Sequence, residues 1–336
     1  MVAISPASAA PTGGFVEYPD QLHAPCEGVY QQSSDRIFVE EIVNPSETGN
    51  IGAIGVLDPA TGTIQRHPLP VPGTTAGGAA LGSDGNLWFT YFGASSGVAF
   101  LDPTNGKFST FPTRDPASTP TDIWPGPDNA MYFAESIAQK IGRVDLKSHQ
   151  ISETPIPGGG LSVPTTIMMP GKGNKMMFSA ALTNSIIEYD TVTHEFTKHQ
   201  VPTPNAVPQG LTIGPDGAIW FSESVGGKIG RIDPDTGVIA EYSIATAEVP
   251  MPSMGPLVLG ADGNLWSANG GFTGGSTVGR FDTTTHRIDY FHLPRPASGP
   301  CDIDPVAAAH GKLVIGQTTG GAIAVAEVAD LDALKP

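Results

Sequence analysis

Acidic, amide and hydroxyl side chains recur in this sequence where short apolar segments begin or end. Carboxylates and a histidine at such places can act as general acids or bases, and amides and hydroxyls can orient a substrate. Several carboxylates around one mouth could also hold Mg²⁺ or Ca²⁺ through oxygen ligands. The alternative, that these acids are solvated or accept hydrogen bonds from backbone amides, stays open. The residues that we expect to do chemistry are His23, Asp122, Glu135, Gln209, Glu223, Ser253 and Gln317.

The composition excludes several other kinds of protein. The chain of 336 residues carries a net charge of −16, which would repel a nucleic-acid backbone. No apolar run is long enough to span a membrane, and no Cys/His spacing indicates zinc. A nucleophile-elbow, P-loop or dinucleotide-binding motif is also missing. We therefore assign no cofactor or metal, and expect a monomer whose partner is a small molecule; a lyase reaction would require Mg²⁺.

The candidate residues belong to a repeated unit of about 45 residues. The most regular part of the unit is a short apolar segment that occurs seven times. A repeat of this length is typical of one four-stranded propeller blade. The sequence thus predicts an all-β protein, a seven-bladed β-propeller of four-stranded antiparallel blades. The seven copies are residues 36–40, 86–90, 130–134, 175–179, 218–222, 264–268 and 312–316.

Each unit contains four expected strands, most clearly in residues 208–242. Strand a starts at Pro208, and an Asp216-Gly217 turn leads into strand b, since Asp-Gly favours a tight hairpin. Residues 229–233 form strand c, and residues 238–242 form strand d. Alternation, β-branched residues and turn residues agree at every step.

The two ends of the chain are expected to meet. The seventh unit lacks a strand d, and a matching segment, residues 14–18, precedes the first strand a. We expect this segment to complete the last blade and so remove an exposed sheet edge. Cys26 and Cys301 begin strand a in the first and last blades, which are neighbours in a closed ring. We expect them to form a disulfide, with two unrelated thiols as the alternative.

The domain organisation is expected to be simple. Residues 1–13 are interpreted as a flexible tail, and residues 14–336 as one seven-bladed propeller. The tail contains Ala-Ser-Ala, which is typical of a signal-peptide cleavage site. We therefore expect a secreted protein whose signal peptide has been removed, with an ordinary disordered tail as the alternative.

The strand order assigns one face of the ring to the site. Strand a begins and strand b ends on the same face, here called the rim, so the d–a and b–c loops meet there. A concave, partly apolar rim with a few polar groups is the usual form of a small-molecule site, although these side chains could instead pack the loops on themselves. Glu27, Glu41 and Asp302 are further acids of the rim. The residues expected to contact the substrate are Glu40, Tyr91, Phe92, Thr121, Thr165, Leu182, Met254, Asn269 and Phe272.

The unit at residues 208–242, and with it the whole set of copies, resembles the repeat of the virginiamycin B lyase (streptogramin lyase) family. The resemblance implies a seven-bladed fold and the opening of a cyclic depsipeptide ester by Mg²⁺-assisted elimination. It also implies histidines after the proline of strand a in the last two blades, and a glutamate at the end of strand b in the last blade. The matching positions here hold Ser253 or Met254, Cys301 and Gln317. Because none carries an imidazole or a carboxylate, we expect a different reaction.

Secreted fungal proteins with a similar repeat are natural-product cyclases, among them hetero-Diels–Alderases that act on tropolone sesquiterpenoids. Such a reaction needs a shaped apolar cavity and hydrogen-bond donors to a polarised carbonyl, which this rim could supply. Our first interpretation is therefore a secreted enzyme that cyclises a small, largely apolar natural product. A Mg²⁺-dependent C–O lyase is one alternative, and a non-catalytic propeller that binds a ligand or a protein is another.

Overall fold

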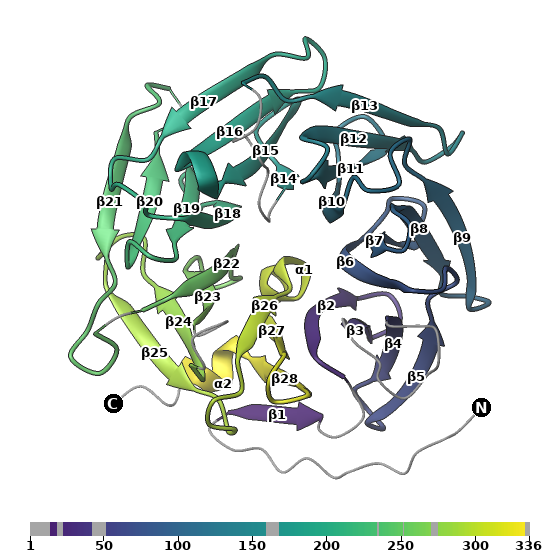
Figure 1. Cartoon of the computed structure of the whole chain (residues 1–336). Coiled ribbons are helices and arrows are strands. Elements are labelled where there is room, and N and C mark those ends of the chain that lie inside the picture. The colour runs from purple at the N-terminus through teal and green to yellow at the C-terminus, as the bar shows by residue number, and fades with distance from the viewer. Residues whose placement is uncertain are drawn as a thin grey trace.

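Four-stranded antiparallel sheets stand around a central axis in the computed structural model of the chain (Figure 1). The structure describes residues 14–18, 23–41, 52–158, 168–233, 235–250, 252–269 and 275–332, so the expected tail lies outside the described residues. Seven such sheets, here blades 1 to 7 in ring order, occur in the described part of the chain. This confirms the predicted seven-bladed propeller.

The blades follow the repeat unit. Blades 1 and 2 contain β2 (Pro25–Gln31), β3 (Arg36–Glu41), β4 (Ala53–Asp58) and β5 (Thr63–Pro68), then β6 (Thr74–Leu81), β7 (Leu87–Gly93), β8 (Gly97–Asp102) and β9 (Lys107–Pro112). Blades 3 and 4 contain β10 (Pro120–Pro125), β11 (Ala130–Glu135), β12 (Lys140–Asp145) and β13 (Ile151–Pro155), then β14 (Met168–Pro170), β15 (Lys175–Ala180), β16 (Ser185–Asp190) and β17 (Phe196–Gln200). Blades 5 and 6 contain β18 (Pro208–Ile213), β19 (Ile219–Glu223), β20 (Lys228–Ile232) and β21 (Ile239–Ser243), then β22 (Met254–Leu259), β23 (Leu265–Asn269), β24 (Thr277–Phe281) and β25 (Ile288–His292).

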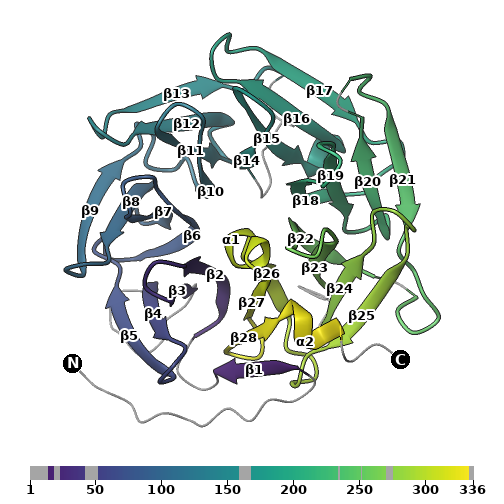
Figure 2. The ribbon, with the colours of Figure 1, turned by 180° about the vertical axis from the view of Figure 1, so that it is seen from behind.

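Blade 7 joins the two ends of the chain. It contains β26 (Pro300–Ile303), β27 (Lys312–Gln317) and β28 (Ala322–Glu327), and β1 (Phe15–Tyr18) is its outer strand. β1 pairs antiparallel with β28, with Phe15 opposite Ala326, and the Phe15 ring is fully buried. The two strands lie side by side in both ribbon views (Figures 1 and 2). The expectation that the N-terminal strand completes the last blade is confirmed.

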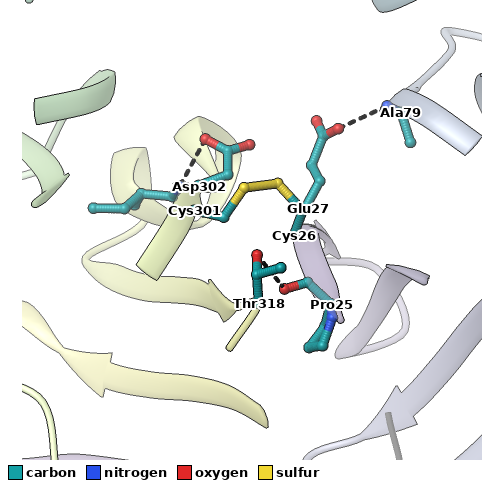
Figure 3. The surroundings of a disulfide bond; sticks show 8 residues. Pro25, Cys26, Glu27, Ala79, Cys301, Asp302 and Thr318 are labelled. Atoms are coloured by element: carbon teal, nitrogen blue, oxygen red, sulfur yellow. Dashed lines mark hydrogen bonds between the residues drawn. A yellow bond between two sulfur atoms is a disulfide. The ribbon is translucent and has the colours of Figure 1, made fainter. Parts of the chain in front are cut away.

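A disulfide joins the first strand of blade 1 to the first strand of blade 7 (Figure 3). The Cα atoms of Cys26 and Cys301 are 5.1 Å apart, and the bond links positions 275 residues apart in the chain. Ring closure brings the two cysteines together, since neighbouring inner strands carry them at the same position. The predicted disulfide is therefore confirmed.

Turn aspartates hold the core tryptophans of strand b. In blade 5 the indole Nε1 of Trp220 donates to Asp216 Oδ1 at 3.0 Å, and Gly217 supplies the positive φ of 73° that the turn requires. The same Asp–Trp bond recurs in blade 6, from Trp266 to Asp262 at 3.1 Å. The repeated turn therefore both reverses the chain and satisfies a buried N–H group.

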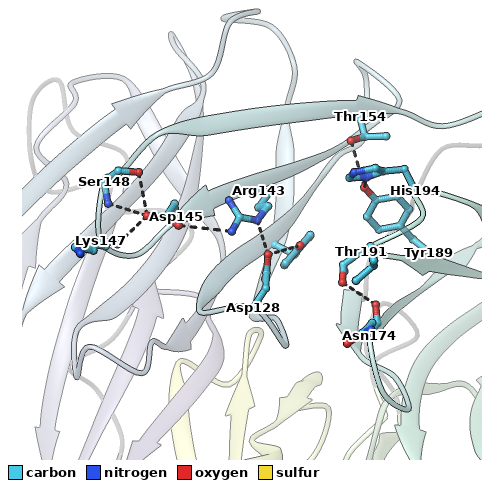
Figure 4. A network of polar contacts seen from close by, with 12 residues as sticks. Asp128, Arg143, Asp145, Lys147, Ser148, Thr154, Asn174, Tyr189, Thr191 and His194 are labelled. Atoms are coloured by element: carbon cyan, nitrogen blue, oxygen red, sulfur yellow. Dashed lines mark hydrogen bonds and ion pairs between the residues drawn. The ribbon is translucent and has the colours of Figure 1, made fainter.

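Polar contacts also fix the turns on the face opposite the rim (Figure 4). Arg143 Nε donates to Asp128 Oδ2 at 2.7 Å, which ties strand c of blade 3 to its a–b turn. His194 lies in the c–d turn of blade 4, where its Nδ1 is 2.6 Å from the Tyr189 hydroxyl. This histidine therefore lies on the face that was expected to carry no chemistry.

Blade 7 carries two short α-helices, one between β26 and β27 and one after β28. α1 (Pro305–Ala309) replaces the usual a–b turn and lies against β2, β22 and β27, inside the ring of inner strands (Figure 1). Asp304 caps it by accepting from the Val306 amide at 2.8 Å, and it also accepts from the Tyr30 amide in blade 1. α2 (Val328–Asp332) follows β28. None of the described helices is long and apolar enough to cross a membrane.

Removing the disulfide should lower the stability of the ring. The bond closes a loop of 275 residues, for which the chain-entropy model allows up to about 5 kcal/mol. The variant C26A/C301A should keep its β-rich circular dichroism spectrum, because β1 still completes blade 7, but should unfold at a lower denaturant concentration. A reductant should lower the midpoint of the native protein to that of the variant and leave the variant unchanged. Equal midpoints of the oxidised protein and the variant would contradict this prediction.

Candidate functional site

The inner strands enclose one large cavity at the rim. Its volume is about 600 Å³, and every one of the seven blades contributes to its lining. The lining consists mainly of the first residues of strand a, with a few residues from strand b and the b–c loops. Pro305, the first residue of α1, lies at the inner end. The rim was therefore the correct face in which to look for a pocket.

Six of the residues predicted for the site, besides the two cysteines, line this cavity. Thr121 and Asp122 come from β10, and Thr121 Oγ1 is 2.9 Å from the hydroxyl of Ser136. The Ser253 amide donates to Asn269 Oδ1 at 2.8 Å, so Asn269 positions a lining residue. The predicted residues that line the cavity are Glu40, Thr121, Asp122, Gln209, Ser253 and Met254.

The other predicted residues lie outside the cavity lining or outside the described residues, and strand register explains four of them. The last residue of strand b pairs with the first residue of strand a, so its side chain points away from the channel; Glu41, opposite Pro25, is an example, and it binds Arg66 Nε at 2.8 Å. Glu135, Glu223, Asn269 and Gln317 occupy the same position in their blades.

The remaining predicted residues either make local contacts away from the cavity or are exposed to solvent. The His23 amide donates to Glu41 Oε2 at 3.2 Å, and Tyr91 is buried against Gly97 of β8. Phe92 packs against Gly77, and Leu182 is 64% exposed on a b–c loop. Thr165 and Phe272 lie outside the described residues.

Four carboxyl groups line the cavity, and two of them were not among the predicted site residues. Glu27 and Asp302 belong to the rim acids that were noted in the sequence. The sequence does contain a sign that these acids belong together, namely their position. Each of Glu27, Asp122 and Asp302 is the third residue of a strand a that begins with proline. A register shift in strand a at this point turns these residues toward the channel.

The four acids differ in their hydrogen bonds. Glu27 Oε2 accepts from the Ala79 amide of blade 2 at 2.9 Å, and Asp302 Oδ1 accepts from the Ile303 amide at 2.7 Å (Figure 3). Asp122 Oδ1 accepts from the Ile123 amide at 2.8 Å. Glu40 is 5% exposed, and its Oε1 has no hydrogen-bond partner among the described residues. Among the described residues, Glu27, Glu40 and Asp302 are therefore only partly compensated by hydrogen bonds from the protein.

Burial raises the pKa values of three of these acids, Glu27, Glu40 and Asp302. It is the main reason why the pKa of Glu40 rises to about 8, with a smaller opposing effect of the Gly78 amide and a further rise from Asp302. Burial likewise raises the pKa of Asp302 to about 7, against the effect of the Ile303 amide. The pKa of Glu27 lies well above its ordinary value, because of burial and the nearby Asp302, Glu40 and Asp122. At neutral pH the cavity therefore contains protonated carboxyl groups.

The register also settles which residue of blade 6 matches Cys301. Leu257 pairs with Ser267 as Ile303 pairs with Ile315, so Gly255 takes the place of Cys301. Ser253 and Met254, the residues chosen from the sequence, lie two and one positions earlier. Position two of strand a therefore holds a glycine in blade 6 and a disulfide cysteine in blade 7.

A metal ion would find few ligands here. In the described part of the chain, no group of three or more His, Cys, Asp or Glu side chains is placed to hold a metal. Gln317 stands where the resemblance implies a glutamate, and its Nε2 donates to Glu17 Oε1 of β1 at 2.9 Å. The Mg²⁺ that the resemblance implies does not fit these residues.

The family model described as the virginiamycin B lyase family matches residues 46–325. The chain belongs to the virginiamycin B lyase family. Among solved structures it is similar to virginiamycin B lyase from Staphylococcus aureus, with 25% identity, a TM-score of 0.79, and coverage of 93% of this chain and 98% of that chain. It is also similar to a streptogramin B lyase, with 26% identity, a TM-score of 0.78, and coverage of 93% and 96%.

A catalytically inactive form of the Staphylococcus aureus virginiamycin B lyase with quinupristin shares 23% identity at a TM-score of 0.78, with coverage of 93% of this chain and 98% of that chain, which speaks for the fold alone. Among proteins of curated function, none matches this chain in sequence.

The buried acids should make the protein less stable as the pH rises. The ordinary pKa of 4.5 applies to Glu40 in the unfolded chain, so between pH 4.5 and about 8 the folded state holds the extra proton. The free energy of unfolding should therefore fall with rising pH across this window. The variant E40Q should gain on the order of 2 kcal/mol over the native protein near the upper end and little near the lower end.

Urea denaturation at several pH values measures this difference. E195Q, which changes an exposed glutamate of a c–d turn, is the matched control and should follow the native protein throughout. An E40Q variant that is equally destabilised at all pH values would show that Glu40 is ionised in the folded state.

Proposed function

We propose that this protein is an enzyme that binds a small, largely apolar molecule in the rim cavity and promotes its cyclisation, of the hetero-Diels–Alder type. One feature carries the proposal: an apolar cavity of about 600 Å³ contains carboxyl groups whose burial raises their pKa values to about 7 and about 8. A protonated carboxyl group in a dry site is a strong hydrogen-bond donor, as in enzymes that polarise a carbonyl group.

Asp302 is the donor that we assign to the reacting centre. It is half-buried and lines the cavity beside the disulfide, and one of its oxygens already accepts from Ile303, which leaves the other for the substrate. A hydrogen bond to the carbonyl oxygen of a heterodiene withdraws electrons and speeds addition to an alkene. Two π bonds are converted into two σ bonds, the remaining one shifts, and no atom leaves. Thr121, Gln209 and Ser253 would orient the two reacting parts.

Elimination is the second candidate, and family membership favours it. The relatives named above are lyases, and the C–O bond of a cyclic depsipeptide would be the target. This chemistry needs a base where the chain has Gly255, Cys301 and Gln317, and we derive no step through Mg²⁺ because the residues do not fit it. A non-catalytic binding propeller is the remaining alternative. The disulfide is typical of an oxidising compartment, which supports our proposal of secretion.

Turnover assays separate these readings. The purified protein is incubated with ortho-quinone methides, generated in the buffer from benzylic precursors, and with apolar alkenes, and separately with quinupristin. Cyclisation predicts an adduct with the summed mass of its reactants, formed faster than in buffer, enriched in one enantiomer and unaffected by EDTA. Adducts that stay racemic at the rate in buffer would contradict the proposal. Opening of quinupristin that EDTA abolishes would favour the lyase.

The variant D302N tests the donor directly. Asparagine keeps a weaker hydrogen-bond donor but cannot ionise, so kcat should fall by about tenfold to a hundredfold and lose its pH dependence. The native enzyme should lose activity above about pH 7, where Asp302 gives up its proton. D235N, which changes an exposed aspartate on the opposite face, is the control. An unchanged pH profile in D302N would remove Asp302 from the mechanism.

A further inference from the structure

We propose that the rim cavity selects a substrate with a positive charge, a protonated amine on a largely apolar body. This inference rests on the proposed function only in calling the ligand a substrate. The preference for a cationic ligand follows from the cavity lining itself. It names a chemical class that neither the fold nor the family implies.

The charges of the cavity lining are all of one sign. Four carboxyl groups face the cavity, whereas no Lys, Arg or His is found among the described residues that line it. Buried acids are ordinarily paired with a cation or with several donors. Glu41 illustrates the paired case, since Arg66 binds it on the outer side of the same strand. Among the described residues no cationic side chain pairs with Glu27 or Glu40, so a cationic ligand would supply what Arg66 supplies to Glu41.

Glu40 points independently to a ligand. Its side chain is 5% exposed and lines the cavity, and its Oε1 has no hydrogen-bond partner among the described residues. A buried acceptor without a partner costs stability unless something binds it. An ammonium group donates up to three N–H bonds and would satisfy this oxygen.

The charged end of the ligand has a defined place. Glu27, Trp124 and Pro305 line both the large cavity and a small one of about 50 Å³ beyond it, so they stand at the neck between the two. Trp124 lies two residues after Asp122 on β10. An indole face beside carboxylates is the usual environment for a substituted ammonium ion. We therefore place the ammonium group at this neck, against Glu27 and Trp124 and near Glu40, whose carboxyl group lies close enough to raise the pKa of Glu27.

The rest of the cavity suits an apolar body. Leu211, Met254, Leu257 and Val258 line it on the side of blades 5 and 6, across from the acids of blades 1 and 3. Ile303 and Met169 extend this surface. One end of the ligand would therefore be charged and the other apolar.

Ligand binding should move a proton. A protonated Glu40 that comes to face an ammonium ion loses its proton to the solvent, and the ammonium ion keeps its own, so one proton leaves for each cation bound. The charge balance is restored inside the cavity by the new ion pair. Asp302 lines the large cavity and not the small one, so its protonated form remains available to the carbonyl group of the substrate.

Three ligands that share the adamantane cage separate the effect of charge on affinity from the effect of size. 1-Adamantylamine, 1-adamantanol and 1-adamantanecarboxylate differ mainly in charge. Isothermal titration calorimetry near neutral pH should give an affinity for the amine at least about tenfold above that for the alcohol, and no detectable binding of the carboxylate. Titration in two buffers of different ionisation enthalpy should report proton release with the amine and not with the alcohol.

Variants assign this preference to the residues named. E40Q should lower the affinity for the amine about tenfold and leave that for the alcohol unchanged, and W124L should weaken the amine more than the alcohol. E195Q should change neither, and the denaturation midpoint of each variant reports whether it folds. Equal affinities for amine and alcohol, a preference for the carboxylate, or no binding of any probe would overturn the inference. Selective binding of the amine without any cyclised product would retain it and overturn the proposed function instead.

Discussion

The closure of the ring is the constraint on which the rest of the structure depends. β1 pairs with β28 and so completes blade 7 from the other end of the chain, and the disulfide joins the inner strands of blades 1 and 7. Glu27 and Asp302 follow the two cysteines directly in the sequence. Because the ring is closed, both acids face the same cavity. A ring left open between these blades would expose both acids to water, and their pKa values would return to the ordinary range.

The same closure explains why the acids are tolerated. Seven inner strands surround the cavity, and α1 lies inside the ring, so the carboxyl groups of the lining are largely removed from solvent. Carboxyl groups in such a space keep their protons rather than pay the cost of ionisation. Backbone amides of neighbouring strands stabilise them in part, as the Ala79 amide of blade 2 does for Glu27. The cavity is therefore lined mainly by apolar atoms and contains four carboxyl groups. This combination is suited to hydrogen-bond donation and to binding a cation.

The sequence predicts the fold well because every blade repeats the same local signals. Several copies contain the same signals as the Asp216-Gly217 turn, the Trp220 strand and the outer strand that follows them. The unmatched strand at residues 14–18 can pair only with the blade that lacks a strand d. The site is harder to predict, since adjacent residues of one strand face opposite sides. Glu40 lines the cavity and Glu41 binds Arg66, yet the sequence offers no sign of which does which. The register shift in strand a, which turns Glu27 and Asp302 inward, likewise becomes visible only in the paired strands.

Carbon-13 NMR of the side-chain carboxyl groups, followed through a pH titration, tests the central claim most directly. Glu40 is assigned by the loss of its signal in E40Q. We predict that Glu40 changes its chemical shift with a midpoint near pH 8, far above the ordinary glutamate pKa of 4.5. A Glu40 signal with its midpoint at the ordinary value would mean that water reaches the cavity freely, and the protonated acids on which the proposed chemistry rests would not exist.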